Sequence, residues 1–153
     1  MPTFRFRASV ALDLRRKEEA SALAARALAQ ARFHELQSAI AAAREDQDRA
    51  RADLTTLERQ GTEVGTLLWH RNWNTRLTAA IERLQRELDE RANDLRTAEE
   101  AWREARRRRL ALERMKERAW ERHLRAEAHQ EMTEMNELAR IRYVMPDTWR
   151  HES

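Results

Sequence analysis

The sequence predicts an all-α protein: two long helices that form an antiparallel coiled-coil hairpin, with a short helical segment at its tip. Ala, Arg, Glu, Leu and Lys supply 93 of the 153 residues, which is typical of long helices. Only two Gly and two Pro are present, too few for the turns of a sandwich, a barrel or a doubly wound sheet. Apolar residues also recur at steps of three and four over two long stretches, as they do in coiled coils.

The first helix is expected at about residues 5–58. Its clearest part is a heptad seam with one polar member, formed by Phe33, Leu36, Ile40, Ala43, Gln47, Ala50, Leu54 and Leu57. Before Phe33, the apolar residues keep a looser helical spacing that does not hold the same register: Phe6, Val10, Leu14, Ala20, Leu23, Ala27 and Ala31. The sequence therefore predicts one helix with a well-defined seam only in its second half.

The chain reversal is expected at Gly61 and Gly65, because these are the only internal glycines and the pattern lapses there. Residues 59–73 would form the turn and the tip segment, which is too apolar for a plain solvated loop. The second helix would cover about residues 74–144, with Asn72 or Asn74 as its N-cap and Pro146 excluding a regular continuation. Residues 1–145 would thus be a single hairpin domain and residues 146–153 a flexible tail.

The seam of the second helix is longer than that of the first. Its apolar members are Leu77, Ile81, Leu84, Leu88, Leu95, Ala98, Trp102, Ala105, Leu112, Ala119 and Ala126. The intervening seam positions hold Arg91, Arg109, Lys116 and His123. Two seams in one chain favour a hairpin over a pair of separate rods.

Charge favours antiparallel pairing within the chain. A reversal near residue 67 would bring residues 5–17, with a net charge of +4, to about residues 117–129. Residues 127–137, with a net charge of −4, lie within a turn or two of that position. Each exposed ion pair stabilises by only about 0 to 1 kcal/mol, so the match argues for orientation more than for stability.

Composition excludes several classes of protein. There is no Cys, hence no disulfide framework and no thiolate chemistry, and the net charge is only +3 although 37% of the residues are charged. No signal-peptide apolar region is present, and no apolar run approaches the ~20 residues of a membrane span. We expect a soluble, cytoplasmic protein.

Enzyme signatures are missing as well. The sequence holds no G-x-S-x-G motif, no phosphate-binding Gly-rich loop and no Cys/His pair, so we expect neither catalytic residues nor a cofactor. His123 and Glu127 are four residues apart and could face one ion, but that helix face offers no third ligand at a helical spacing. No metal site is expected.

Two surfaces are candidates for binding other proteins. Residues 103–125 carry a net charge of +6, and their centre is the run Arg106, Arg107, Arg108 and Arg109. Four consecutive arginines point in four directions on a helix, so a solvated shaft and a contact for an acidic protein both remain open. Nucleic acid is disfavoured, because aromatic interleaving and a DNA-reading motif are missing.

The second candidate surface lies near the tip. Trp73, Leu77, Ala80 and Leu84 follow one another at steps of four, three and four, with Trp69 one turn earlier. Packing against a folded-back tip and an exposed docking patch are both open, since Trp and Leu are costly to leave in water unless something covers them.

Three segments resemble a known family. They are FRFRASVALDLRRKEEA at residues 4–20, LERMKERAWERHL at residues 112–124 and EMNELA at residues 134–139. The chain is similar through them to FliJ, the cytoplasmic stalk protein of the bacterial flagellar type III export apparatus, and the resemblance covers most of its length. It implies a two-helix coiled coil similar to the rotor stalk of rotary ATPases.

The resemblance also implies partners and a location. It implies that the protein stands in the hexameric export ATPase, promotes its assembly and activity, reaches the cytoplasmic domain of the export gate, and binds export chaperones. It places the protein at the flagellar basal body on the inner membrane, without a membrane span. The family's gate-binding positions match Trp73, Leu77, Ala80 and Leu84, although Leu84 stands where relatives can carry a polar residue. A generic coiled-coil scaffold or adaptor and an injectisome stalk protein remain alternatives, and the sequence does not indicate which end enters the ring.

Overall fold

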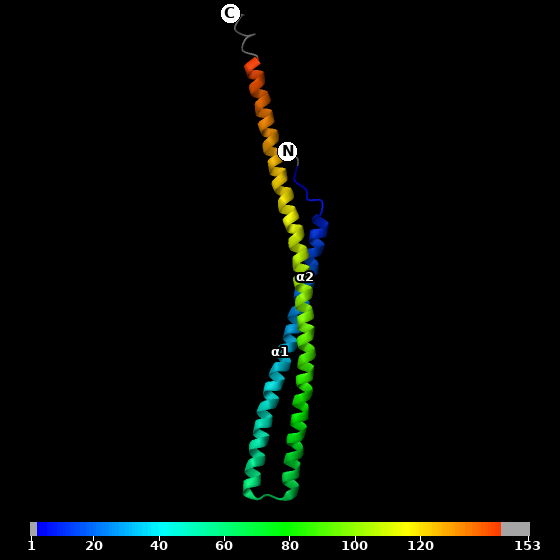
Figure 1. Cartoon of the computed structure of the whole chain (residues 1–153), viewed down its shortest axis with the longest axis vertical. Coiled ribbons are helices and arrows are strands. Elements are labelled where there is room, and N and C mark those ends of the chain that lie inside the picture. The colour runs from blue at the N-terminus through cyan, green and yellow to red at the C-terminus, as the bar shows by residue number, and fades with distance from the viewer. Residues whose placement is uncertain (1–2, 145–153) are drawn as a thin grey trace, which may run out of the picture. The chain divides into compact units, whose positions relative to one another are not determined.

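The protein consists of two long helices joined by a short turn. The computed structural model describes residues 3–144, in which α1 is Ser9–Gln60 and α2 is Val64–Val144 (Figure 1). Residues 3–144 contain no strand. The predicted all-α fold with two long helices is confirmed, whereas the tail expected at residues 146–153 lies outside the described residues.

The chain divides into two compact units. The first, which we call the turn unit, is residues 17–106 and contains most of α1, the turn and the first half of α2. The second, the terminal unit, contains residues 3–16 and 107–144 of the described chain. The sequence had indicated one hairpin domain over residues 1–145, and the division falls within both helices.

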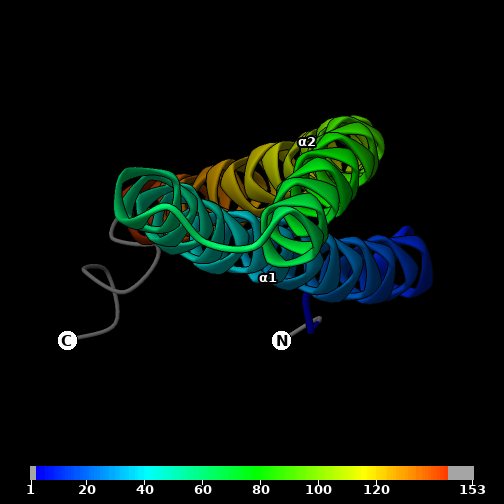
Figure 2. The same ribbon diagram turned by 90° about the horizontal axis from the view of Figure 1, so that it is seen from below.

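The turn lies where the first of the two glycines predicts it. Gly61 has φ +72°, a left-handed conformation that favours Gly directly after a helix, and Thr62 Oγ1 donates a hydrogen bond to the carbonyl of Leu57 at 3.1 Å. Figure 2 looks onto this turn from below. α2 already begins at Val64, so Gly65 lies inside a helix rather than in the turn.

The tip segment differs from the expectation, because it is not a separate helix. Residues 64–73 are the first turns of α2. Asn74, expected as an N-cap, instead donates its Nδ2 to the carbonyl of His70 at 2.9 Å and to that of Ala50 on α1 at 3.4 Å. The seam therefore extends from Leu77 toward the turn through two polar residues, Asn74 and His70. These polar residues do not end the helix, which begins at Val64.

In the turn unit, the seam residues of α1 from Phe33 onward are the predicted ones. Ile40 and Ala50 of α1 and Ile81 of α2 are buried. Gln47, the polar member, donates its Nε2 to Thr78 Oγ1 across the two helices at 3.0 Å, so its amide is not left without a partner. The remaining apolar members are half-buried, as expected for a two-helix interface open on both sides: Phe33, Leu36, Leu54, Leu57, Leu77, Leu84 and Leu88.

The predicted register before Phe33 is wrong. Val10, with 80% of its surface exposed, Leu14 and Leu23 all lie outside the seam. The heptad of the second half continues backwards without a break, and its members are buried or half-buried: Ala29, Arg26, Ala22, Glu19, Arg15 and Leu12. Sequence patterning missed these positions because half of them carry a charge and two of the others are only alanine.

The terminal unit is held together by contacts at its N-terminal end. Arg16 Nη2 lies 3.4 Å from Glu113 Oε1, and the ring of Phe4 lies 5.1 Å from that of Trp120 and 5.4 Å from that of His123. Residues 4–16 therefore lie beside residues 113–123. This is close to the expected pairing with about residues 117–129 but is displaced toward lower residue numbers, because the chain turns at residues 61–63 rather than near residue 67. The acidic stretch at residues 127–137 is therefore not the segment that residues 4–16 contact.

α2 continues beyond the part that residues 4–16 pack against (Figure 1). We call residues 128–144 the overhang; every side chain in it is exposed. The seam positions become polar there, at Gln130, Thr133, Glu137 and Arg140, so the pattern that joins the helices ends before α2 does. Among the described residues, neither helix holds a segment long and apolar enough to cross a bilayer.

Candidate functional site

The four tip residues suggested by the sequence do not form one exposed surface. Leu77 and Leu84 are half-buried and occupy the same seam as Ile81, so they pack toward α1. Trp73 is 43% exposed, and Ala80, about two turns further along α2, is half-buried. The structure thus separates two packing residues from two that border the open face of α2.

An exposed aromatic pair marks that open face. The rings of Trp69 and Trp73 are stacked with centroids 6.2 Å apart and planes 10° apart, and Trp69 is 61% exposed. Leu68 and Val64, close to the turn, are exposed as well. Large apolar side chains gathered in this way are typical of a contact surface.

Two arginines extend this surface along α2, and sequence analysis missed them. Arg76 and Arg83 are exposed and continue the steps of four and three that begin at Trp69 and Trp73 and pass through Ala80. We call Trp69, Trp73, Arg76, Ala80 and Arg83 the tip stripe. Its heptad spacing can be seen in the sequence. Sequence analysis instead assigned the larger residues of the neighbouring seam, Leu77 and Leu84, to the candidate surface.

The four arginines of the basic run differ in exposure. Arg106, which belongs to the turn unit, is exposed, and so are Arg107 and Arg108 of the terminal unit. Arg109 is half-buried at its predicted seam position and donates from Nη1 to Glu113 Oε2 at 2.7 Å, a charge-assisted hydrogen bond. Arg109 therefore serves packing, and the three arginines before it carry the exposed charge.

Trp102 organises the seam of the turn unit where charged residues enter it. The guanidinium carbon of Arg26 on α1 lies 4.7 Å from the Trp102 ring centroid, and that of Arg106 lies 5.5 Å from it. Glu99 Oε1 lies 3.9 Å from Arg26 Nε, too far for a hydrogen bond but close enough to balance the charge. Trp102, predicted as an apolar seam residue, thus packs against two arginine side chains.

His123 and Glu127 lie close together on one face of α2. His123 Nε2 lies 3.1 Å from Glu127 Oε1, and the His123 ring also stacks on Trp120. Within residues 3–144, no three His, Cys, Asp or Glu side chains are grouped so that they could hold a metal ion. The cluster fixes the N-terminal segment, through Phe4, to α2.

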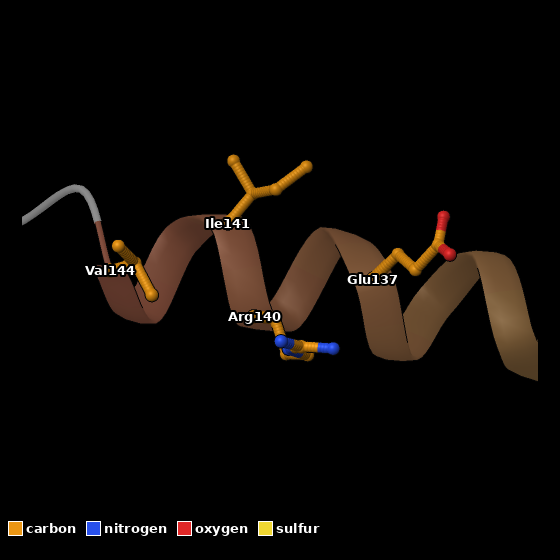
Figure 3. A pocket seen from close by; sticks show the side chains of 4 residues that line it. All are labelled: Glu137, Arg140, Ile141 and Val144. Atoms are coloured by element: carbon orange, nitrogen blue, oxygen red, sulfur yellow. The ribbon is translucent and has the colours of Figure 1, made fainter.

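The overhang offers open apolar surface. Met132, Met135, Leu138 and Ile141 are exposed, with Met135 at 70%. Figure 3 shows the last turns of α2, where Glu137 and Ile141 project to one side and Arg140 to the other. Among the residues that the structure describes, those that line this hollow, Glu137, Arg140, Ile141 and Val144, all lie on α2.

These features define a two-helix coiled-coil protein whose candidate sites are side-chain surfaces. The family model of the flagellar FliJ protein matches residues 6–146, and the chain belongs to this family. The family is that of a flagellar export stalk protein, a non-enzymatic component of type III export. No curated protein and no solved structure matches the chain.

Proposed function

We propose that this protein is the stalk that couples the flagellar export ATPase to the export gate. In this proposal it binds the hexameric ATPase, favours the assembled ring, raises ATP hydrolysis and contacts the cytoplasmic domain of the gate at the basal body. The observation that carries the proposal is the family match over residues 6–146 of a chain that folds as two long helices.

The ring contact is assigned to the terminal unit. Arg107 and Arg108 are exposed there, within a stretch of α2 whose net charge is +6 over residues 103–125. A protein without catalytic groups raises turnover only by binding the competent ring better than separate subunits, since a ligand shifts an equilibrium through differential affinity. Acidic groups in the ring channel would supply that difference.

The test is ATP hydrolysis by the cognate export ATPase as the chain is added. We expect hydrolysis and hexamer formation to rise together, and less so at high salt, where exposed charges are screened over about 10 Å or less. Arg107→Glu with Arg108→Glu should weaken the effect. The matched control, Arg86→Glu with Arg96→Glu, makes the same charge change at exposed positions of the turn unit and should stimulate normally.

Two outcomes would count against the assignment. Full stimulation by the Arg107 and Arg108 variant would remove the basic run from the ring contact. No stimulation by the unaltered chain would favour a scaffold or adaptor that does not act on the ATPase.

The gate contact is assigned to the tip, where Trp73 and Ala80 border the exposed face of α2. Chaperone binding is assigned to the overhang, where Met132, Met135 and Leu138 are exposed apolar side chains. Met135→Glu with Leu138→Glu should reduce retention of a cognate export chaperone on the immobilised protein. Unchanged retention would move this contact elsewhere.

A further inference from the structure

We propose that the overhang binds the overhang of a second copy of this chain, in antiparallel orientation, through a heptad row of its own. The row consists of Ala128, Glu131, Met135, Leu138 and Arg142, and we call it the overhang stripe. The inference goes beyond the proposed function and depends on none of its contacts with the ATPase, the gate or chaperones. It gives the last turns of α2 a partner that the same chain supplies.

The overhang stripe is a second heptad row on α2. Its members follow one another at steps of three, four, three and four, as the seam residues of a coiled coil do. Each stands one or two residues after a position of the first seam, at residues 126, 130, 133, 137 and 140. One residue corresponds to about 100° around a helix, so the stripe lies on a different side of α2 from the first seam.

The apolar part of the overhang stripe is open in the structure. Met135 is 70% exposed and Leu138 is 60% exposed, and their neighbours Met132 and Ile141 are exposed as well. Figure 3 shows Ile141 projecting from the helix with no other element of the chain near it. Large apolar side chains gathered on so short a segment are typical of a contact surface.

The two charged members of the stripe have no partner within the helix. No Lys or Arg stands three or four residues from Glu131, and no Asp or Glu stands three or four residues from Arg142. Within residues 3–144, neither side chain takes part in an ion pair. One carboxylate and one guanidinium group are thus both available to a second helix, at opposite ends of the stripe.

The stripe is complementary to itself in one antiparallel register. When the numbers of facing residues sum to 273, Met135 faces Leu138 of the second copy and Glu131 faces its Arg142. The two-fold axis repeats both pairs, so two apolar layers lie at the centre and two ion pairs lie outside them. A parallel pair would instead place Glu131 against Glu131 and Arg142 against Arg142, which repel.

This self-complementarity favours a second copy over an unrelated helix. A surface that serves only a different protein does not need opposite charges at equal distances from its own midpoint, as Glu131 and Arg142 are. The stripe is about 21 Å long at 1.5 Å per residue, so the interface is small and the dimer is weak. Because Met135 and Leu138 also belong to the surface assigned to chaperones, a bound chaperone and a second copy would exclude each other.

The experiment is sedimentation equilibrium of the full chain over about 10 μM to 1 mM, in which we expect dimers to form as the concentration rises. Glu131→Arg alone and Arg142→Glu alone should each weaken dimerisation about tenfold or more, since two attractions become two repulsions. An equimolar mixture of these two variants should dimerise as the unaltered chain does, because every facing pair then has opposite charges.

The matched controls are Glu137→Arg and Arg140→Glu, which make the same charge changes at exposed positions of the overhang outside the stripe. Both should dimerise as the unaltered chain does, and helix content should match among all the proteins. A monomer at every concentration, or equal dissociation constants for the stripe variants and the controls, would overturn the inference. Neither result would affect the ATPase or gate contacts.

Disulfide trapping tests the orientation, since the chain has no cysteine of its own. A Met135→Cys chain and a Leu138→Cys chain, only one of them tagged, are mixed and mildly oxidised. The antiparallel register places these two positions opposite each other, so we expect the mixed disulfide to exceed both homodimeric products. Homodimeric disulfides in excess would indicate a parallel pair and overturn the inference.

Discussion

At the scale of single residues, aromatic rings make charged seam positions tolerable in this protein. Arg26 occupies a position where a coiled coil usually buries an apolar side chain, and its guanidinium lies over Trp102. The alkyl stem of an arginine covers apolar surface while its head interacts with a ring face, so such a residue fills a seam without a buried unpaired charge. Trp102 on α2 thus packs against an arginine of α1, at a position where a coiled coil usually places an apolar side chain.

This account predicts that the tryptophans differ in their contribution to stability. Trp102→Ala should lower the free energy of unfolding by about 3 kcal/mol, because it removes a large seam residue and the platform for Arg26. Trp69→Ala should change it by about 0.5 kcal/mol or less, since the ring is mostly exposed. Urea unfolding followed by circular dichroism compares the two, and equal losses would show that the stacked tip pair is a packing element.

A second pair of substitutions separates packing from docking at the tip. Leu77→Ala should cost about 2 kcal/mol or more of unfolding free energy, because Leu77 lies in the seam with the buried Ile81. Trp73→Ala should cost much less and instead weaken binding to the gate domain. If Leu77→Ala leaves the thermal midpoint unchanged, the seam does not extend toward the turn as described.

At the scale of the helices, the seam changes character along α1. Between Glu19 and Ala29 it contains alanine and charged residues, whereas from Phe33 to Leu57 most of its members are large and apolar. Segments with few buried apolar contacts open at lower free energy than those with many. The helix is continuous, but its attachment to α2 is uneven.

Hydrogen exchange should reveal this difference. Amides of residues 19–29 should exchange faster than those of residues 36–57, although both lie inside α1. Mass spectrometry of the exchanging protein measures the two segments side by side. Equal protection would mean that Arg26, Trp102 and their neighbours stabilise the seam as well as leucine and isoleucine do.

The parts of the fold that sequence could predict are those where large apolar residues mark the seam. The runs Phe33 to Leu57 and Leu77 to Leu112 were assigned correctly, because both helices there follow simple heptads. The start of α2 and the seam before Phe33 were not, because His70, Asn74, Glu19 and Arg26 hide the pattern. These polar residues are tolerated through interactions across the helices, which a single sequence does not display.

The candidate site was predictable to a smaller extent. Sequence spacing located the tip and the basic run, but it could not separate Leu77 and Leu84, which pack, from Trp73, which is exposed. Adjacent rows on a helix differ by one residue in sequence and by about 100° in direction. An error of one residue in register therefore assigns every residue of a row to the wrong face of the helix. The arginines of the tip stripe became visible only once the seam was placed.

At the scale of the whole molecule, the proposed contacts lie on different units. The tip stripe belongs to the turn unit, and Arg107, Arg108 and the overhang belong to the terminal unit. Separate surfaces on one chain allow two partners to be bound at the same time, which is what a coupling protein requires. A simple activator of the ATPase would not need the tip.

The most direct test of this account is whether the chain bridges the two machines. Tagged export ATPase is immobilised, and the cytoplasmic domain of the gate is added with or without the chain. We expect the gate domain to be retained only when the chain is present, and to be retained less with Trp73→Ala while the chain itself stays bound. Retention of the gate domain without the chain, or its failure to bind when the chain is present, would contradict the coupling role.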